Sequence, residues 1–237
     1  MTYDEIIKTL HSLANPETVS FKERKFGVKS VNTLGIYQKD LNEIIKETIP
    51  EKKLAIQLFE SGIYEGRVLC AKLFPPKELT EDLMEQWVKT FENWEICDTF
   101  SMKLFARSDF ALSKIKEWIN REPEFEKRAG FTTMAAYCMA DKKAPNYIYE
   151  EFLSDIKSHS GDNRLYVKKA VNWALRSVGK RNIDLNKMAI STAKQILELP
   201  DKSAKWIAKD AIKELESDSV NILDYPRSIY RPTKKGA

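Results

Sequence analysis

The chain has 237 residues, which is enough to bury one large core or two small ones, and we expect a single domain over residues 1–218. Its 39 basic and 35 acidic side chains leave a net charge of +4, so affinity for an anionic partner must come from local clusters. With only two histidines, a Ser-His-Asp triad or a His-rich metal site is excluded. The eight glycines form no phosphate-binding loop, and we expect no metal and no cofactor.

The cysteines and the hydropathy indicate the compartment. Cys70, Cys97 and Cys138 are widely spaced and form no C-x-x-C pair, which is typical of reduced thiols inside a cell. The first residues lack a cationic start followed by an apolar core, and no apolar run approaches the ~20 residues that span a bilayer. We therefore expect a cytoplasmic protein with no membrane partner.

Nearly every segment of the chain carries the apolar period of a helix, and almost none alternates like a strand. Proline and N-cap residues divide this pattern, with Thr80, Asn93 and either Ser108 or Asp109 expected as caps. About thirteen helices are predicted, over residues 2–13, 16–29, 38–48, 50–62, 64–74, 80–91, 94–106, from 108 or 109, 123–140, 146–157, 162–179, 184–198 and 201–216. Residues 219–237 have no apolar face and are predicted to be an irregular or mobile basic tail.

Many helices joined by short loops are typical of proteins built from internal repeats. The run Phe125-Glu-Lys-Arg128-Ala matches Tyr166-Val-Lys-Lys169-Ala, and the two cations lie 41 positions apart. Lys205 follows 36 positions after Lys169, and Arg67 is a degenerate earlier copy. This spacing is near the ~40–47 residues of HEAT or armadillo units. We predict an all-α, curved HEAT/armadillo-like α-solenoid of about six helix pairs, with these cations along its concave face. The alternative is that they cap helices or pair with acids of the next repeat.

Residues 162–181 read as one helix with two opposed faces. Its apolar stripe consists of Val167, Ala170, Val171, Ala174, Leu175 and Val178. The opposite face carries Lys169, Trp173, Arg176 and Lys180. A tryptophan off the apolar stripe with cations one turn away on each side suits an anionic, flat partner, which favours DNA. The alternative is a solvated basic face with a half-buried indole in cation–π contact.

Trp94 and Asp98 are the candidate catalytic pair. They stand at i and i+4, so they share one helix face, and Asn93 as N-cap places Trp94 at the helix start. A carboxylate beside an indole can stabilise a positively charged transition state. The alternative is a structural ion pair of Asp98 and a Trp94 buried in the core.

Three segments in this order resemble the AlkD-like family of DNA alkylation repair proteins. They are Asn93-Trp94-Glu-Ile-Cys-Asp98, Phe125-Glu-Lys-Arg128-Ala and Asp162 to Arg181 with its Ala170-x-x-Trp173-x-x-Arg176 helix. The resemblance implies a HEAT-like DNA glycosylase that removes cationic N3- and N7-alkylated purines. It also implies that Asp98 is catalytic, that Trp94 and Trp173 flank the deoxyribose of the lesion, and that Arg128 contacts the DNA backbone.

The remaining predicted DNA-binding cations are Arg164, Lys169, Arg176, Lys180 and Lys205. The expected partner is alkylated double-stranded DNA, bound by a monomer that associates with the nucleoid. A cationic purine leaves without a general acid, so one carboxylate that stabilises the sugar cation and orients a water is sufficient. Two other functions stay open: a non-catalytic binder of unusual DNA structures, and a HEAT-type protein scaffold that does not touch DNA.

Overall fold

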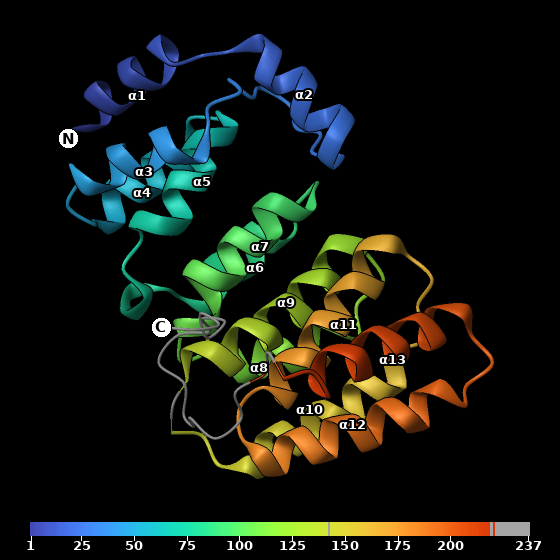
Figure 1. The fold of residues 1–237 in the computed structure, drawn as a ribbon. Helices are drawn as coiled ribbons and strands as arrows, with labels where there is room; N and C mark the ends of the chain where they lie inside the picture. Colours follow the sequence, from blue (N-terminus) through green and yellow to red (C-terminus); the bar gives the residue numbers. More distant parts are fainter. Residues whose placement is uncertain (142, 219, 221–237) are drawn as a thin grey trace, which may run out of the picture. The chain divides into compact units, whose positions relative to one another are not determined.

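The computed structural model describes residues 1–141, 143–218 and 220, and every regular element in these ranges is a helix. There are thirteen α-helices and two short 3-10 helices in this part of the chain, which confirms the all-helical prediction (Figure 1). The tail predicted for residues 219–237 lies outside the described residues except for Val220. The chain divides into two compact units, Met1–Phe110 and Ala111–Ala237, which are described separately. The single domain over 1–218 stays a prediction.

The first unit holds seven α-helices and both 3-10 helices within its 110 residues. Their bounds are α1 Tyr3–Ser12, α2 Pro16–Phe26, α3 Gln38–Lys46, α4 Lys52–Glu60, α5 Tyr64–Leu73, η1 Pro76–Glu78, α6 Glu81–Val88, α7 Trp94–Lys103 and η2 Phe105–Arg107. Its core is an aromatic cluster in which Trp87 packs against Phe59, Phe74 and Phe100 with ring centroids 5.3–5.4 Å apart. This cluster holds the buried side of α7 in place.

Several helix ends differ from their sequence-based positions, for local reasons. The second helix ends at Phe26 rather than near residue 29, because Gly27 takes the left-handed conformation that closes a helix (φ 66°). The fourth begins at Lys52, two residues after Pro50. Thr80 and Asn93 cap α6 and α7 as predicted, accepting the backbone N–H groups of the third residue beyond each.

The loop between α2 and α3 is fixed by a buried carboxylate. Glu65 of α5, 1% exposed, accepts the backbone N–H groups of Leu34, Gly35 and Ile36 and the hydroxyl of Thr33. Gly35 has a φ of 76°, and a Cβ there would lie 2.2 Å from a backbone oxygen of residue 15. The loop is therefore fixed at residues 33–36, where it lies against the start of α2.

The second unit consists of three helix pairs in its described residues. Their bounds are α8 Ala111–Trp118, α9 Glu124–Ala140, α10 Asn146–His159, α11 Leu165–Gly179, α12 Ile183–Leu197 and α13 Lys202–Leu215. Helices α9, α11 and α13 pack side by side, and α10 packs against α12 (Figure 1). This arrangement is the layered stacking of repeated helix pairs.

Candidate functional site

A polar network fixes the start of α7 in the first unit. The side chain of Asn93 accepts the N–H of Ile96 at 3.1 Å and donates to the carbonyl of Lys29 at 3.0 Å. The buried hydroxyl of Tyr64 donates to Asn93 at 3.1 Å and to Glu95 at 3.0 Å. Burial, followed by the charge of Glu95, raises the pKa of Tyr64 far above its ordinary value, so the phenol stays a donor. The Asn93 cap and its contacts with Lys29 and Tyr64 thus fix the first turn of α7.

Trp94 stands on this fixed turn and is partly buried, so its indole is neither enclosed in the core nor fully exposed. Its indole N–H donates to the carbonyl of Phe26 at the end of α2, at 2.9 Å. Lys22 of α2 also forms an ion pair with Glu95, at 3.0 Å between nitrogen and oxygen. These two links between α2 and α7 restrict how the indole can turn.

Asp98 follows Trp94 by one helical turn and is also partly buried. Its neighbours Ile96, Cys97 and Phe100 are completely buried, so they determine which face of α7 points outward. Trp94 and Asp98 therefore lie one turn apart on the side of α7 that is not fully buried. Such a pair can stabilise positive charge that develops beside it.

In the second unit, α11 has the two faces predicted from its sequence. All six residues of the apolar stripe are 0% exposed. Trp173 is half-buried and packs partly against this core, while Lys169 is exposed. Lys169 is thus exposed on the predicted basic face, whereas the Trp173 indole lies partly in the core and partly at the surface.

Arg128 of α9 has an environment that its sequence pattern did not predict. It is only 6% exposed, and its guanidinium donates to the backbone carbonyl of Tyr166 at 2.5 Å. The rings of Phe125 and Tyr166 lie 5.4 Å apart, centroid to centroid. The two matching sequence segments therefore touch each other, and Arg128 joins α9 to α11.

Arg164 precedes α11 and lies in a dense charge cluster. Its guanidinium pairs with Asp162 at 2.5 Å and also donates to the carbonyl of Glu122. Lys127 approaches the same carboxylate at 3.4 Å. Burial alone raises the pKa of Asp162, but the bonds from Arg164 and the charge of Lys127 outweigh it, and the pKa lies below its ordinary value. Arg164 thus stabilises this unit through its contacts with Asp162 and the carbonyl of Glu122.

Arg176 and Lys180 both contact one acid of α13. Arg176 forms an ion pair with Glu214, and Lys180 approaches its other oxygen at 2.5 Å. Burial raises the pKa of Glu214, but the bonds and charges of Lys180 and Arg176 prevail and lower it. Arg176 and Lys180, which the sequence placed on the basic face, thus pair with an acid of the next helix pair.

Lys169 and Lys205 are exposed, and neither forms a hydrogen bond or an ion pair through its side chain with any residue in the described ranges. They are the two predicted DNA-binding cations whose charge is left for an external partner. Sequence reasoning missed Trp206, which is 41% exposed beside Lys205. Like Trp173, Trp206 lies off the apolar stripe of its helix, with a lysine about one turn away on each side.

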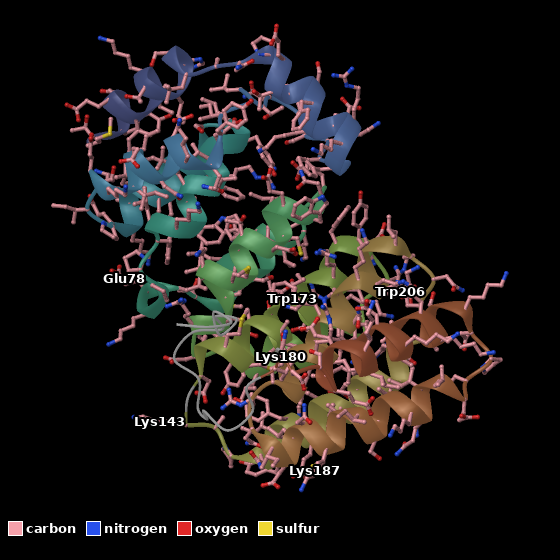
Figure 2. All side chains as sticks on the ribbon, in the orientation of Figure 1. Glu78, Lys143, Trp173, Lys180, Lys187 and Trp206 are labelled. Atoms are coloured by element: carbon pink, nitrogen blue, oxygen red, sulfur yellow. The ribbon has the colours of Figure 1, made fainter. Side chains whose placement is uncertain are left out.

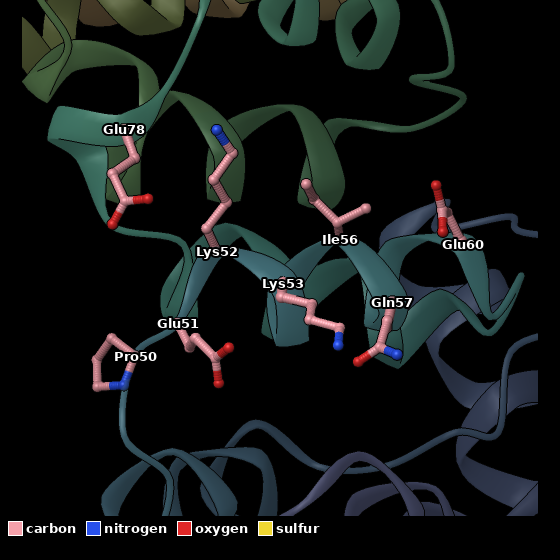
Figure 3. A pocket seen from close by; sticks show the side chains of 8 residues that line it. All are labelled: Pro50, Glu51, Lys52, Lys53, Ile56, Gln57, Glu60 and Glu78. Atoms are coloured by element: carbon pink, nitrogen blue, oxygen red, sulfur yellow. The ribbon is translucent and has the colours of Figure 1, made fainter.

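The described residues offer neither a metal site nor a membrane span. No group of three or more His, Cys, Asp or Glu side chains in them could hold a metal ion, and none of the helices found there is long and apolar enough to cross a bilayer. A surface pocket beside α4 is lined by exposed side chains of both charges, among them Glu51, Lys53 and Glu60 (Figure 3). It contains none of the predicted site residues.

The repeated helix pairs define an all-helical protein of HEAT-like fold. Residues 6–215 match the DNA alkylation repair enzyme family, and the chain belongs to this family. A solved structure described as a new family of proteins related to the HEAT-like repeat DNA glycosylases, with affinity for branched DNA structures, superposes with a TM-score of 0.73. It covers 97% of this chain and 99% of its own at 17% identity, which supports the fold.

Two curated relatives come from Listeria. The uncharacterized protein Lin0241 of Listeria innocua is 24% identical over 221 residues, covering 91% of this chain and 96% of the relative. The uncharacterized protein Lmo0209 of Listeria monocytogenes is 23% identical over 199 residues, covering 83% and 87%. These likenesses extend over most of each chain.

Proposed function

We propose that the chain is a monofunctional DNA glycosylase that hydrolyses the N-glycosidic bond of cationic N3- and N7-alkylated purines in duplex DNA. The observation that carries this proposal is the pair of partly buried side chains Trp94 and Asp98, one helical turn apart on α7, with the indole anchored to the carbonyl of Phe26. Membership of the DNA alkylation repair enzyme family supports it.

The chemistry requires little more than this pair. An alkylated purine already carries positive charge, so it departs without protonation, and the bond breaks towards an oxocarbenium-like sugar. The carboxylate of Asp98 stabilises that charge and orients a water towards the anomeric carbon. The indole of Trp94 adds cation–π stabilisation as charge develops. Trp173 is assigned to the deoxyribose on the family resemblance.

The test is the release of 3-methyladenine and 7-methylguanine from methylated duplex DNA, resolved chromatographically. We expect release by the wild-type protein and none by Asp98→Asn. Asp109→Asn is the matched control, because it makes the same change at an exposed position beyond α7. Full release by Asp98→Asn would show that the carboxylate is not catalytic.

A non-catalytic binder of DNA structures is the second candidate. It is favoured by the branched-DNA affinity in the description of the superposed protein. It predicts salt-sensitive DNA binding without base release. A failure to bind DNA even at low salt would instead favour a protein scaffold.

A further inference from the structure

The outer face of α13 is a row of lysines around one tryptophan. The helix buries Ala204, Ile207, Ala208 and Ala211, all 0% exposed. The residues between them are exposed and include Lys202, Lys205, Trp206, Lys209 and Lys213. None of these four lysines forms a hydrogen bond or an ion pair through its side chain with a residue in the described part of the chain. Their charge is therefore available to a partner in solution.

The acids of α13 do not neutralise this row, because they are turned towards α11. Asp210 accepts the side-chain N–H of Asn172 at 2.6 Å, and Glu214 is occupied by Arg176 and Lys180. Helix α13 thus has an acidic side that contacts α11 and a basic side that faces the solvent. An anion that approaches the outer side meets the lysines of α13, while Asp210 and Glu214 are engaged on the other side.

Trp206 lies within this row with 41% of its surface exposed, and Lys168 of α11 places its ammonium 5.0 Å from the ring centroid (Figure 2). A large exposed indole is unfavourable unless a partner covers it, and the cation–π contact limits the positions the ring can take. A positioned aromatic surface with lysines on both sides along its helix is the combination that binds single-stranded nucleic acid.

The partner has to present both phosphates and an accessible base. In an intact duplex the base faces are stacked on each other, so Trp206 could reach only the backbone. Unpaired nucleotides at an overhang, flap or gap expose a base that stacks on an indole, with phosphates for the neighbouring lysines. We propose that Trp206, with Lys168, Lys202, Lys205 and Lys209, forms a contact site for unpaired nucleotides adjoining a duplex.

This site uses none of the residues assigned to base release, so it can be tested whether or not the chain is a glycosylase. The measurement is the affinity for two probes: a blunt 20-base-pair duplex, and the same duplex with a 10-nucleotide single-stranded overhang. We expect wild type to prefer the overhang probe. Trp206→Ala should remove that preference by weakening overhang binding about tenfold, and should leave blunt-duplex binding unchanged.

Two further variants complete the design. Trp206→Phe keeps an aromatic face and should retain most of the preference. Lys187→Ala removes an exposed cation from α12 and should change neither affinity (Figure 2). The proposal is overturned if wild type binds both probes equally, if Trp206→Ala keeps the preference, or if it weakens both probes alike. Release of alkylated purine from a blunt duplex should be the same in wild type and Trp206→Ala.

Discussion

Glu214 of α13 pairs with two cations of the predicted basic face, and replacing it tests how much these ion pairs contribute to stability. Glu214→Gln removes the charge that Arg176 and Lys180 share and leaves one weaker acceptor. A lost hydrogen bond to a charged group costs about 1.5–3 kcal/mol, and the Glu214 side chain is 25% exposed, so water compensates in part. We expect about 2 kcal/mol less unfolding free energy at pH 7, or a Tm about 4–8 °C lower.

The same carboxylate should make this difference depend on pH. Because the pKa of Glu214 is lower in the folded than in the unfolded protein, the pair stabilises the fold above the unfolded pKa of about 4.3. That stability is lost as the pH falls through the folded pKa. Wild type and Glu214→Gln should therefore converge at acid pH, where both side chains are neutral.

The assay is urea unfolding followed by circular dichroism at pH 7 and at acid pH. Glu216→Gln is the control, because Glu216 meets Lys194 only at 3.7 Å with both side chains at least half exposed. Such a surface pair is worth about 0–1 kcal/mol. The reasoning is refuted if Glu214→Gln unfolds like wild type at pH 7, or if its deficit persists unchanged in acid.

Three other perturbations test separate parts of the account. Lys169→Ala and Lys205→Ala should each reduce the slope of log affinity for duplex DNA against log salt by about 0.9, and an unchanged slope would show that neither meets a phosphate. Glu65→Gln presents an amide donor to backbone N–H groups and should cost about 2–3 kcal/mol in urea unfolding; a wild-type midpoint would contradict its role in fixing the loop. Trp94→Phe loses the bond to the carbonyl of Phe26 and should cost about 1 kcal/mol, whereas an undiminished stability would mean that the bond contributes nothing.

Helices were predictable from sequence because their signals are local. Asn93 sits directly before an apolar period, and the structure has it capping α7 through the N–H of Ile96. Where an expected helix ran too far, the missed signal was also local: Gly27 ends α2. The apolar stripe of α11 was predicted in full, because burial on one face follows directly from helical spacing.

The environment of the cations was less predictable, because it depends on residues far along the chain. Arg176 and Glu214 are separated by 38 positions, and Arg128 reaches a backbone carbonyl 38 positions away. Helical spacing shows which face Lys169 occupies, but it does not show whether an acid of the next repeat lies opposite. Trp206 was missed although its own spacing placed it off the apolar stripe of α13.

The central claim is that Asp98 performs the chemical step without being needed for binding. Its most direct test is the single-turnover rate of base release from a duplex with one 7-methylguanine, measured beside the affinity for that duplex, in wild type, Asp98→Asn and Asp109→Asn. The account predicts that Asp98→Asn binds at least as tightly as wild type and releases the base at least about 100-fold more slowly, with Asp109→Asn unchanged. Equal rates in wild type and Asp98→Asn, or tight binding by wild type with no release, would contradict it.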